Sequence, residues 1–524
     1  MTTEIDRSGR GGEEGRTSTQ TGPSRLTGRR RGLVLLVLCG TGFLISEDTS
    51  THSIAVPTLL QQLGDRPVLQ TSLWIPKVYV LAFIALLLVG GALVDRLGAK
   101  RVLVGGFLVY LLGSAVHLVL AQTSIPLLLA RIFMGAGVAV IVPATLSILV
   151  LVSEPGGERA RAVTLWAGCC AAGVTVVPLI AGLILNDVVW PRVVAGLGFT
   201  AVVLLIGVVW FVPAVRPDPA CPVDWPAAVT VTLGIGLVAL ALIQAPYWGW
   251  TSPSFGAALA AGVLLAVVSA QIRRAGVLPH DCLRADPRVR LAMAALATAI
   301  LALFGAVFLA IQYLQAMGDR SSILAGAFIF LPACAATAIG AKAGSALQRQ
   351  GCVVAAIVIG LTAMVDGLAI GLTAGTQGEL SPLVAMVAVT SVGFAMVLSI
   401  ALDAISAALP RTRTAIPWAA QMIVVQVSGL LGLAIVGSLV DRGYRAHFVI
   451  PAKLLAHGGA AVSRDPLGKG VAAAASAGEP LAVAVQNAFL AGYRHGLLAI
   501  IGVVAAMVVA ILVSVARARK PKRV

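Results

Sequence analysis

Five charged side chains lie within otherwise apolar stretches of the sequence. They are Glu47, Asp48, Lys77, Arg131 and Asp366. A charge inside a membrane span is costly, so such a residue usually faces a partner or a water-filled pathway. A carboxylate beside a cation stays ionised, and loss of that cation raises its pKa towards neutrality. These residue types therefore indicate a site that binds and releases protons.

The spacing of the charged residues places four of them at one depth of the expected membrane. Asp48 lies about 22 Å from the cytoplasmic surface if the first span begins near residue 33, since a helix rises about 1.5 Å per residue. Lys77 and Arg131 each lie about 6–9 Å inside spans that begin on the outer side. We therefore expect these two bases to face Asp48 and its neighbour Glu47. The alternative is that both bases extend to the outer headgroups while Glu47 faces water.

Two further residues extend this hypothesis. His52 follows Asp48 by one helical turn on the same face, which favours Asp48 over Glu47 as the proton-binding residue. Asp366 lies in the middle third of a later apolar stretch and is the second candidate proton or cation site. The His-Asp-Cys run at 280–282 lacks the spacing of metal ligands. We expect no catalytic group, no metal and no cofactor, with a proton gradient as the energy source.

The composition identifies the elements that must position these groups. The chain has 524 residues, 58% hydrophobic and 11% charged, whereas soluble domains carry about 25% charged residues. Because a helix needs about 20 apolar residues to cross a bilayer, the apolar stretches predict fourteen membrane-spanning helices. They lie near 33–58, 72–94, 102–121, 125–151, 162–186, 193–212, 226–245, 254–272, 291–316, 322–345, 352–374, 382–407, 416–440 and 488–515.

The net charge of +16 follows from orientation. Basic residues gather in both tails and in alternate connectors, as expected of cytoplasmic segments. We therefore expect both termini on the cytoplasmic side of a bacterial cell membrane, membrane lipids as neighbours, and no nucleic-acid partner. From these stretches we predict a disordered cytoplasmic tail at 1–32, a first group of helices at 33–212 and two linker helices at 226–272. A last group of helices follows at 291–515, with a long extracellular loop at 441–486 within it, and a basic cytoplasmic tail ends the chain at 516–524.

The turn after the second stretch carries the most specific motif. Residues 91–101 read Gly-Ala-Leu-Val-Asp-Arg-Leu-Gly-Ala-Lys-Arg. This resembles the loop signature of the major facilitator superfamily, G-x-L-x-D-R-x-G-x-K-R, at Gly91, Asp95, Arg96, Gly98, Lys100 and Arg101. The resemblance implies that Asp95 faces the positive N-terminus of the helix that begins near Pro417, as a latch that holds the outward-open state.

Other motifs resemble the fourteen-span drug:proton antiporter branch of that superfamily. Its first-, fourth- and fifth-span patterns match at Asp48, Arg131, Gly173, Pro178 and Gly182, and the fifth-span pattern is only partly kept. The branch implies an all-α fold of two six-helix bundles, related by a pseudo-two-fold axis, with two extra central helices. Aromatic residues of the expected cavity could stack on a flat substrate; they are Trp74, Tyr79 and Tyr313.

The leading hypothesis is proton-driven export of a lipophilic small molecule by a monomer, through alternating access between the two bundles. Proton-coupled or facilitated uptake of a small metabolite is the first alternative, because the fifth-span motif is weakened. A membrane transferase is the second. It would need a nucleophile or metal cluster at a membrane face, and the run at 280–282 is a poor candidate.

Overall fold

The computed structural model shows a chain of long helices. It describes residues 28–62, 69–120, 123–154, 158–159, 161–163, 165–170, 172–173, 190–214, 225–271, 287–317, 322–408, 415–448 and 479–519. Within these residues the chain forms helices and no strands, which confirms the expected all-helical class. The helices are α1 (Gly28–Gln62), α2 (Leu69–Leu97), α3 (Ala99–Leu120), α4 (Ser124–Val152), α6 (Trp190–Phe211), α7 (Trp225–Trp248), α8 (Pro253–Gln271), α10 (Pro287–Met317), α11 (Ser322–Arg349), α12 (Val353–Gly371), α13 (Ser381–Ala408), α14 (Ala415–His447) and α16 (Glu479–Arg519).

The length and apolarity of these segments explain why they are helical. Among the described residues, ten are long and apolar enough to cross a membrane. An apolar solvent leaves no partner for an open backbone, so each span must satisfy its own hydrogen bonds as a helix. Several helices of the chain contain proline, for example α2 at Pro76, α4 at Pro143 and α11 at Pro332.

The N-terminal helices pack closely where side chains are small. At Gly90 of α2, an added Cβ would lie 2.3 Å from the carbonyl oxygen of Ala139 on α4. At Gly135 of α4, it would lie 2.4 Å from the carbonyl oxygen of Tyr79 on α2. These glycines bring the two backbones into direct contact, and the contact fixes the position of Arg131 one turn before Gly135.

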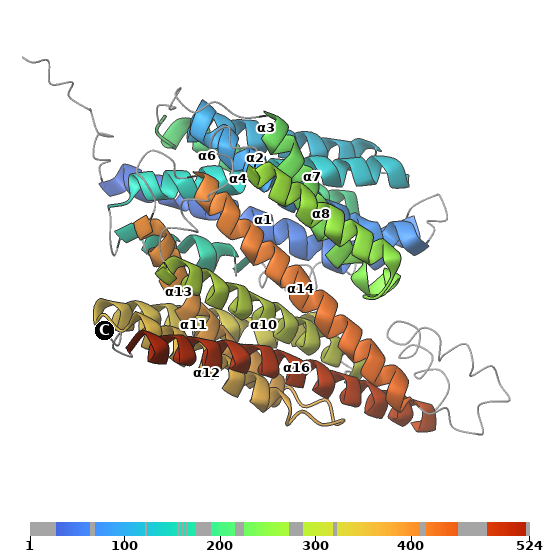
Figure 1. Cartoon of the computed structure of the whole chain (residues 1–524). Coiled ribbons are helices and arrows are strands. Elements are labelled where there is room, and N and C mark those ends of the chain that lie inside the picture. The colour runs from blue at the N-terminus through green and yellow to red at the C-terminus, as the bar shows by residue number, and fades with distance from the viewer. Residues whose placement is uncertain are drawn as a thin grey trace, which may run out of the picture.

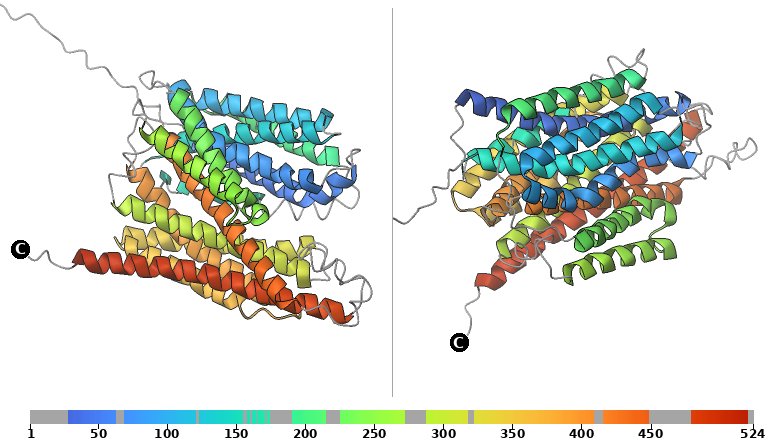
Figure 2. Two further views of the ribbon diagram at one scale, coloured as in Figure 1. Left: turned by 45° about the vertical axis from the view of Figure 1, so that its right-hand side comes forward. Right: turned by 90° about the horizontal axis from the view of Figure 1, so that it is seen from above.

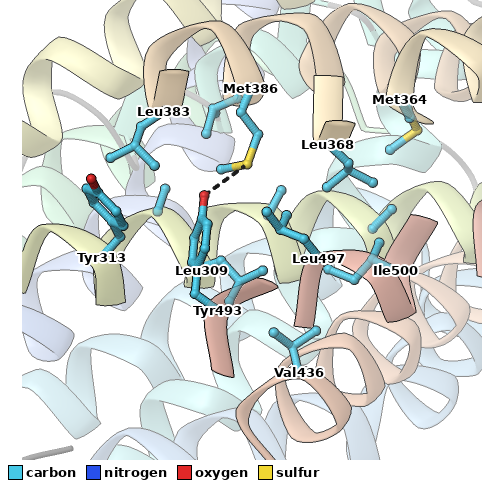
Figure 3. Close-up of a cluster of buried hydrophobic side chains, with 14 of the residues drawn as sticks. Leu309, Tyr313, Met364, Leu368, Leu383, Met386, Val436, Tyr493, Leu497 and Ile500 are labelled. Carbon is cyan, nitrogen blue, oxygen red and sulfur yellow. Dashed lines mark hydrogen bonds between the residues drawn. The ribbon is translucent and has the colours of Figure 1, made fainter. Parts of the chain in front are cut away.

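The C-terminal helices enclose a second core. Figure 3 shows Tyr493 of α16 lying among Leu309, Leu368, Met386 and Leu497. The Tyr493 hydroxyl donates to the carbonyl oxygen of Gly371 at 3.2 Å and contacts the Met386 sulfur at 3.7 Å. This core contains no residue of the N-terminal helices, so the two groups of helices pack around separate centres.

Helix α14 connects the two groups. In Figure 1 it runs diagonally from the N-terminal helices, in blue and cyan, to the C-terminal ones, and the left view of Figure 2 shows the same course. Its first turns contribute Ala415 and Trp418 to the N-terminal core. Its later turns contribute Val436 and Tyr444 to the C-terminal core.

The hairpin of α7 and α8 contacts both groups. Leu88 of α2, Val231 of α7 and Ala419 of α14 belong to one apolar cluster. Further along, the Trp250 indole donates to the Ser438 hydroxyl of α14 at 2.8 Å. The hairpin therefore packs against one helix from each group.

Two expected connectors differ from the structure. The turn expected at 96–101 is almost wholly helical, because α2 ends at Leu97 and α3 begins at Ala99. Gly98 makes the turn alone with φ +91°, which a side chain would disfavour. Helices extend into the expected loop at 441–486 from both sides, since α14 continues to His447 and α16 begins at Glu479.

Candidate functional site

Asp48 and Arg131 form a buried ion pair between α1 and α4. The Arg131 Nη1 atom lies 2.9 Å from Oδ1 and 3.0 Å from Oδ2 of Asp48. The side chains are 0% and 1% exposed. These two residues were expected to face one another from their opposite charges and shared depth, and the structure brings their side chains together.

Residues of α2, α3 and α4 complete the surroundings of the pair. The Arg131 guanidinium lies 4.2 Å from the centre of the Tyr79 ring, a cation–π contact that gains strength where water is excluded. The Met134 sulfur lies 4.0 Å from Nη1. Tyr110 is fully buried within electrostatic range of both charges. Sequence analysis missed Tyr110, because a tyrosine in an apolar helix carries no distinguishing signal.

The other residues expected in the cluster have different positions. Lys77 does not join the pair: its Nζ atom lies 3.9 Å from the centre of the Tyr247 ring on α7, because α7 covers this face of α2. Glu47 is partly buried, and its Oε2 atom has no hydrogen-bond partner among the described residues. The side chain of His52 lies outside the described ones. Asp366 is exposed on α12, a helix with no residue in the N-terminal core, so it does not join the cluster.

A second polar group lies around Thr41, about two turns before Asp48 on α1. The Thr41 hydroxyl donates to the Leu38 carbonyl oxygen at 2.7 Å and lies 3.2 Å from the Thr145 hydroxyl of α4. The Trp166 indole donates to Thr41 at 3.4 Å. These bonds join α1, α4 and the segment that contains Trp166. This network was not predicted from the sequence.

Asp95 contacts the helix that the resemblance implied. Its carboxylate accepts hydrogen bonds from the backbone N–H groups of Ala415 at 3.1 Å and Ile416 at 3.4 Å. These are the first residues of α14, where the helix dipole favours a negative charge. Gly91 packs closely beside them, because an added Cβ would lie 3.1 Å from the Ala415 carbonyl oxygen. The N-terminal helices are thereby bonded to the N-terminal end of α14.

The basic residues of the same motif lie around this contact. Lys100 donates to the Val209 carbonyl oxygen of α6 at 2.9 Å, while Arg96 and Arg101 are exposed. Nearby in the fold, Arg31 of α1 forms a bidentate pair with Glu158, with bonds of 2.9 and 2.6 Å. The hydrogen bond from Arg31 lowers the pKa of the exposed Glu158 carboxyl below its usual value.

The remaining expected residues are partly described. At Gly173, an added Cβ would lie 2.6 Å from the Phe43 carbonyl oxygen, so this glycine permits close packing on α1. Pro178 and Gly182 lie outside the described residues. Trp74 is partly buried. Tyr313 is 0% exposed within the C-terminal core.

The chemistry of the site is that of a buried carboxylate bonded to a guanidinium. Within the described residues no three His, Cys, Asp or Glu side chains are arranged to hold a metal ion.

The sequence matches the family model of the major facilitator superfamily over residues 38–433. It is 26% identical to the multidrug efflux pump LfrA of Mycolicibacterium smegmatis, over 95% of this chain and 96% of that protein. It is 28% identical to the methyl viologen resistance protein SmvA of Salmonella typhimurium, over 81% of this chain and 86% of that protein. With the methylenomycin A resistance protein of Bacillus subtilis it shares 30% identity, over 59% and 66% of the two chains.

Solved structures share the fold at low sequence identity. The human organic anion transporter MFSD10 superposes with a TM-score of 0.59 at 14% identity, over 93% of this chain and 100% of that chain. The proton:xylose symporter XylE superposes with a TM-score of 0.54 at 14% identity, over 90% and 94% of the two chains. The helical fold, the motif at Asp95 and the family match together identify the chain as a member of the major facilitator superfamily, a membrane transporter and not an enzyme.

Proposed function

We propose that this protein exports a lipophilic small molecule in exchange for protons. The observation that carries the proposal is the buried pair of Asp48 and Arg131, at 0% and 1% exposure. Burial of a charge pair costs desolvation free energy, so such a pair is weak evidence for a purely stabilising role. A change of charge at this position would alter the electrostatic energy of its neighbours strongly, because little water screens it.

The contacts around the pair support a cycle of alternating access. Tyr79 and Asp95 both belong to α2: Tyr79 contacts Arg131, and Asp95 contacts the first turn of α14. A proton on Asp48 would release Arg131 and change its contact with Tyr79. Movement of α2 would then weaken the contact at Asp95 and open the inner side.

The direction of transport is inferred from relatives. LfrA is named a multidrug efflux pump and SmvA a methyl viologen resistance protein. We extend this to export of lipophilic, often cationic, compounds by a monomer with fourteen spans and both termini in the cytoplasm.

Transport in inside-out vesicles tests this proposal. With methyl viologen or ethidium added to energised vesicles, we expect substrate-driven proton release that Asp48→Asn abolishes. Asp441→Asn is the matched control, since Asp441 lies in a partly exposed pair with Arg445 near the end of α14. Proton release that persists unchanged in Asp48→Asn would refute the coupling mechanism. Higher accumulation of compound in intact cells that express the protein would indicate uptake instead.

A further inference from the structure

Two polar side chains on α14 are buried without hydrogen bonds. Gln421 is 1% exposed and Trp418 is 0% exposed. Within the part of the chain that the structure describes, neither amide atom of Gln421 has a partner, and nor does the Trp418 indole nitrogen. A buried polar group without a partner is uncommon and destabilising, so two together require an explanation.

The two side chains share one face of α14 close to its inner end. They are three residues apart, so they are neighbours on the helix surface. Gln421 lies six residues from Ala415, about 9 Å along the axis from the turn that Asp95 contacts. Trp418 packs within the core of the N-terminal helices, whereas the later turns of α14 belong to the other group. Trp418 on this face is therefore buried by contact between the two groups, and Gln421 lies one turn further along the same face.

The contacts that bury this face are the ones that must separate when the inner side opens. The carboxylate of Asp95 and the close approach at Gly91 hold α2 against the same turns of α14. After separation, Gln421 and Trp418 would face the opened pathway. The hydrogen-bonding groups that lack partners in the closed state would then be available to a ligand.

We propose that Gln421 and Trp418 form a hydrogen-bonding subsite for a hydroxyl or carbonyl group of the transported molecule. The amide NH₂ and the indole N–H supply donors, and the amide oxygen supplies one acceptor. The subsite is uncharged and on the inner half of α14, so it differs from the charged site at Asp48. It would select, among lipophilic compounds, those with a polar group on an apolar frame. This inference rests on the proposed function, since it concerns the same substrates.

Binding to the purified protein tests the subsite. Doxorubicin carries hydroxyl and carbonyl groups, whereas tetraphenylphosphonium carries no hydrogen-bonding group. We expect Gln421→Met to weaken doxorubicin binding about tenfold, the cost of one or two hydrogen bonds, and to change tetraphenylphosphonium binding less than about twofold. Trp418→Phe should act in the same direction. Gln350→Met, on an exposed turn, is the control for the same chemical change.

Three results would overturn the subsite. Equal weakening of both compounds would mean that Gln421 holds a structural water or the helix packing, and unchanged doxorubicin binding would mean that it does not touch the substrate. The third is the melting temperature without ligand. We expect Gln421→Met to raise it by about 1–2 °C, because an unpartnered amide is removed; a clear fall would show that the amide is already satisfied. Wild-type protein that exports neither compound would instead contradict the proposed function. The melting temperature would then still show whether the Gln421 amide lacks a hydrogen-bond partner.

Discussion

At the scale of single residues, Asp48 and Arg131 depend on each other. Removal of one charge leaves the other buried without its partner, which typically costs about 3–5 kcal/mol. We expect Asp48→Asn and Arg131→Gln each to lower the melting temperature in detergent. The double variant should recover most of the stability but none of the proton-coupled transport. Recovery of transport in the double variant would show that the charges serve the fold alone.

Glu158 offers a prediction about pH. Its pKa is lowered in the folded protein by the hydrogen bond from Arg31, so its contribution to stability is complete above its usual pKa. That contribution is lost as the pH falls through the lowered folded value. We expect the difference in melting temperature between wild type and Glu158→Gln to stay constant from pH 6 to 8, to begin to shrink only below the usual glutamate pKa of about 4.3, and to vanish only once the pH is below the lowered folded value. High salt should also reduce it, because the pair is exposed.

At the scale of helices, Asp95 caps the first turn of α14. Hydrogen bonds to a charged acceptor are worth about 1.5–3 kcal/mol, so Asp95→Ala should speed amide exchange at Ala415 and Ile416 by roughly 10–100-fold. Hydrogen-exchange mass spectrometry measures this directly. Asp441→Ala, at the other end of α14, is the control. Unchanged exchange at the first turn would show that the cap does not hold the inner side closed.

The contact between α2 and α4 depends on glycine. Gly135→Ala would place a Cβ 2.4 Å from the Tyr79 carbonyl oxygen, and forced separation of packed helices costs about 1–3 kcal/mol. We expect a lower melting temperature and weaker transport, because Tyr79 and Arg131 would move apart. At Gly105 of α3 no atom lies within 4 Å of an added Cβ. Gly105→Ala should therefore be neutral or stabilising by up to about 1 kcal/mol.

At the scale of the whole molecule, the hairpin of α7 and α8 is attached to both groups of helices. Trp250→Phe removes the donor of its bond to Ser438 of α14. We expect a loss of about 0.5–1.5 kcal/mol, the usual value for a neutral hydrogen bond. Ser438→Ala should cost about the same, and the double variant no more than either. Additive losses would show that the two side chains act independently.

The sequence predicted the features that charge and length determine. Asp48 and Arg131 were found because a charge stands out in an apolar helix, and helix positions followed from apolar length. The partner of Lys77 was not predictable, because nothing in the sequence says that α7 packs over α2. Gln421 was missed for a different reason: an uncharged amide is tolerated in many helices, and only the tertiary contacts show that it is buried without a partner.

The diagonal course of α14 has a consequence for the surrounding lipid. Its uncharged part, residues 415–440, spans about 39 Å along the helix axis, whereas the hydrocarbon core is about 30 Å thick. A long helix adapts to bilayer thickness by changing its tilt. The first turn of α14 is bonded to Asp95 of α2, and the later turns pack against α16. A change in the tilt of α14 would therefore change the contact that closes the inner side. Hydrophobic mismatch would therefore act on the conformational equilibrium of this transporter, and membranes of different thickness would set different resting states.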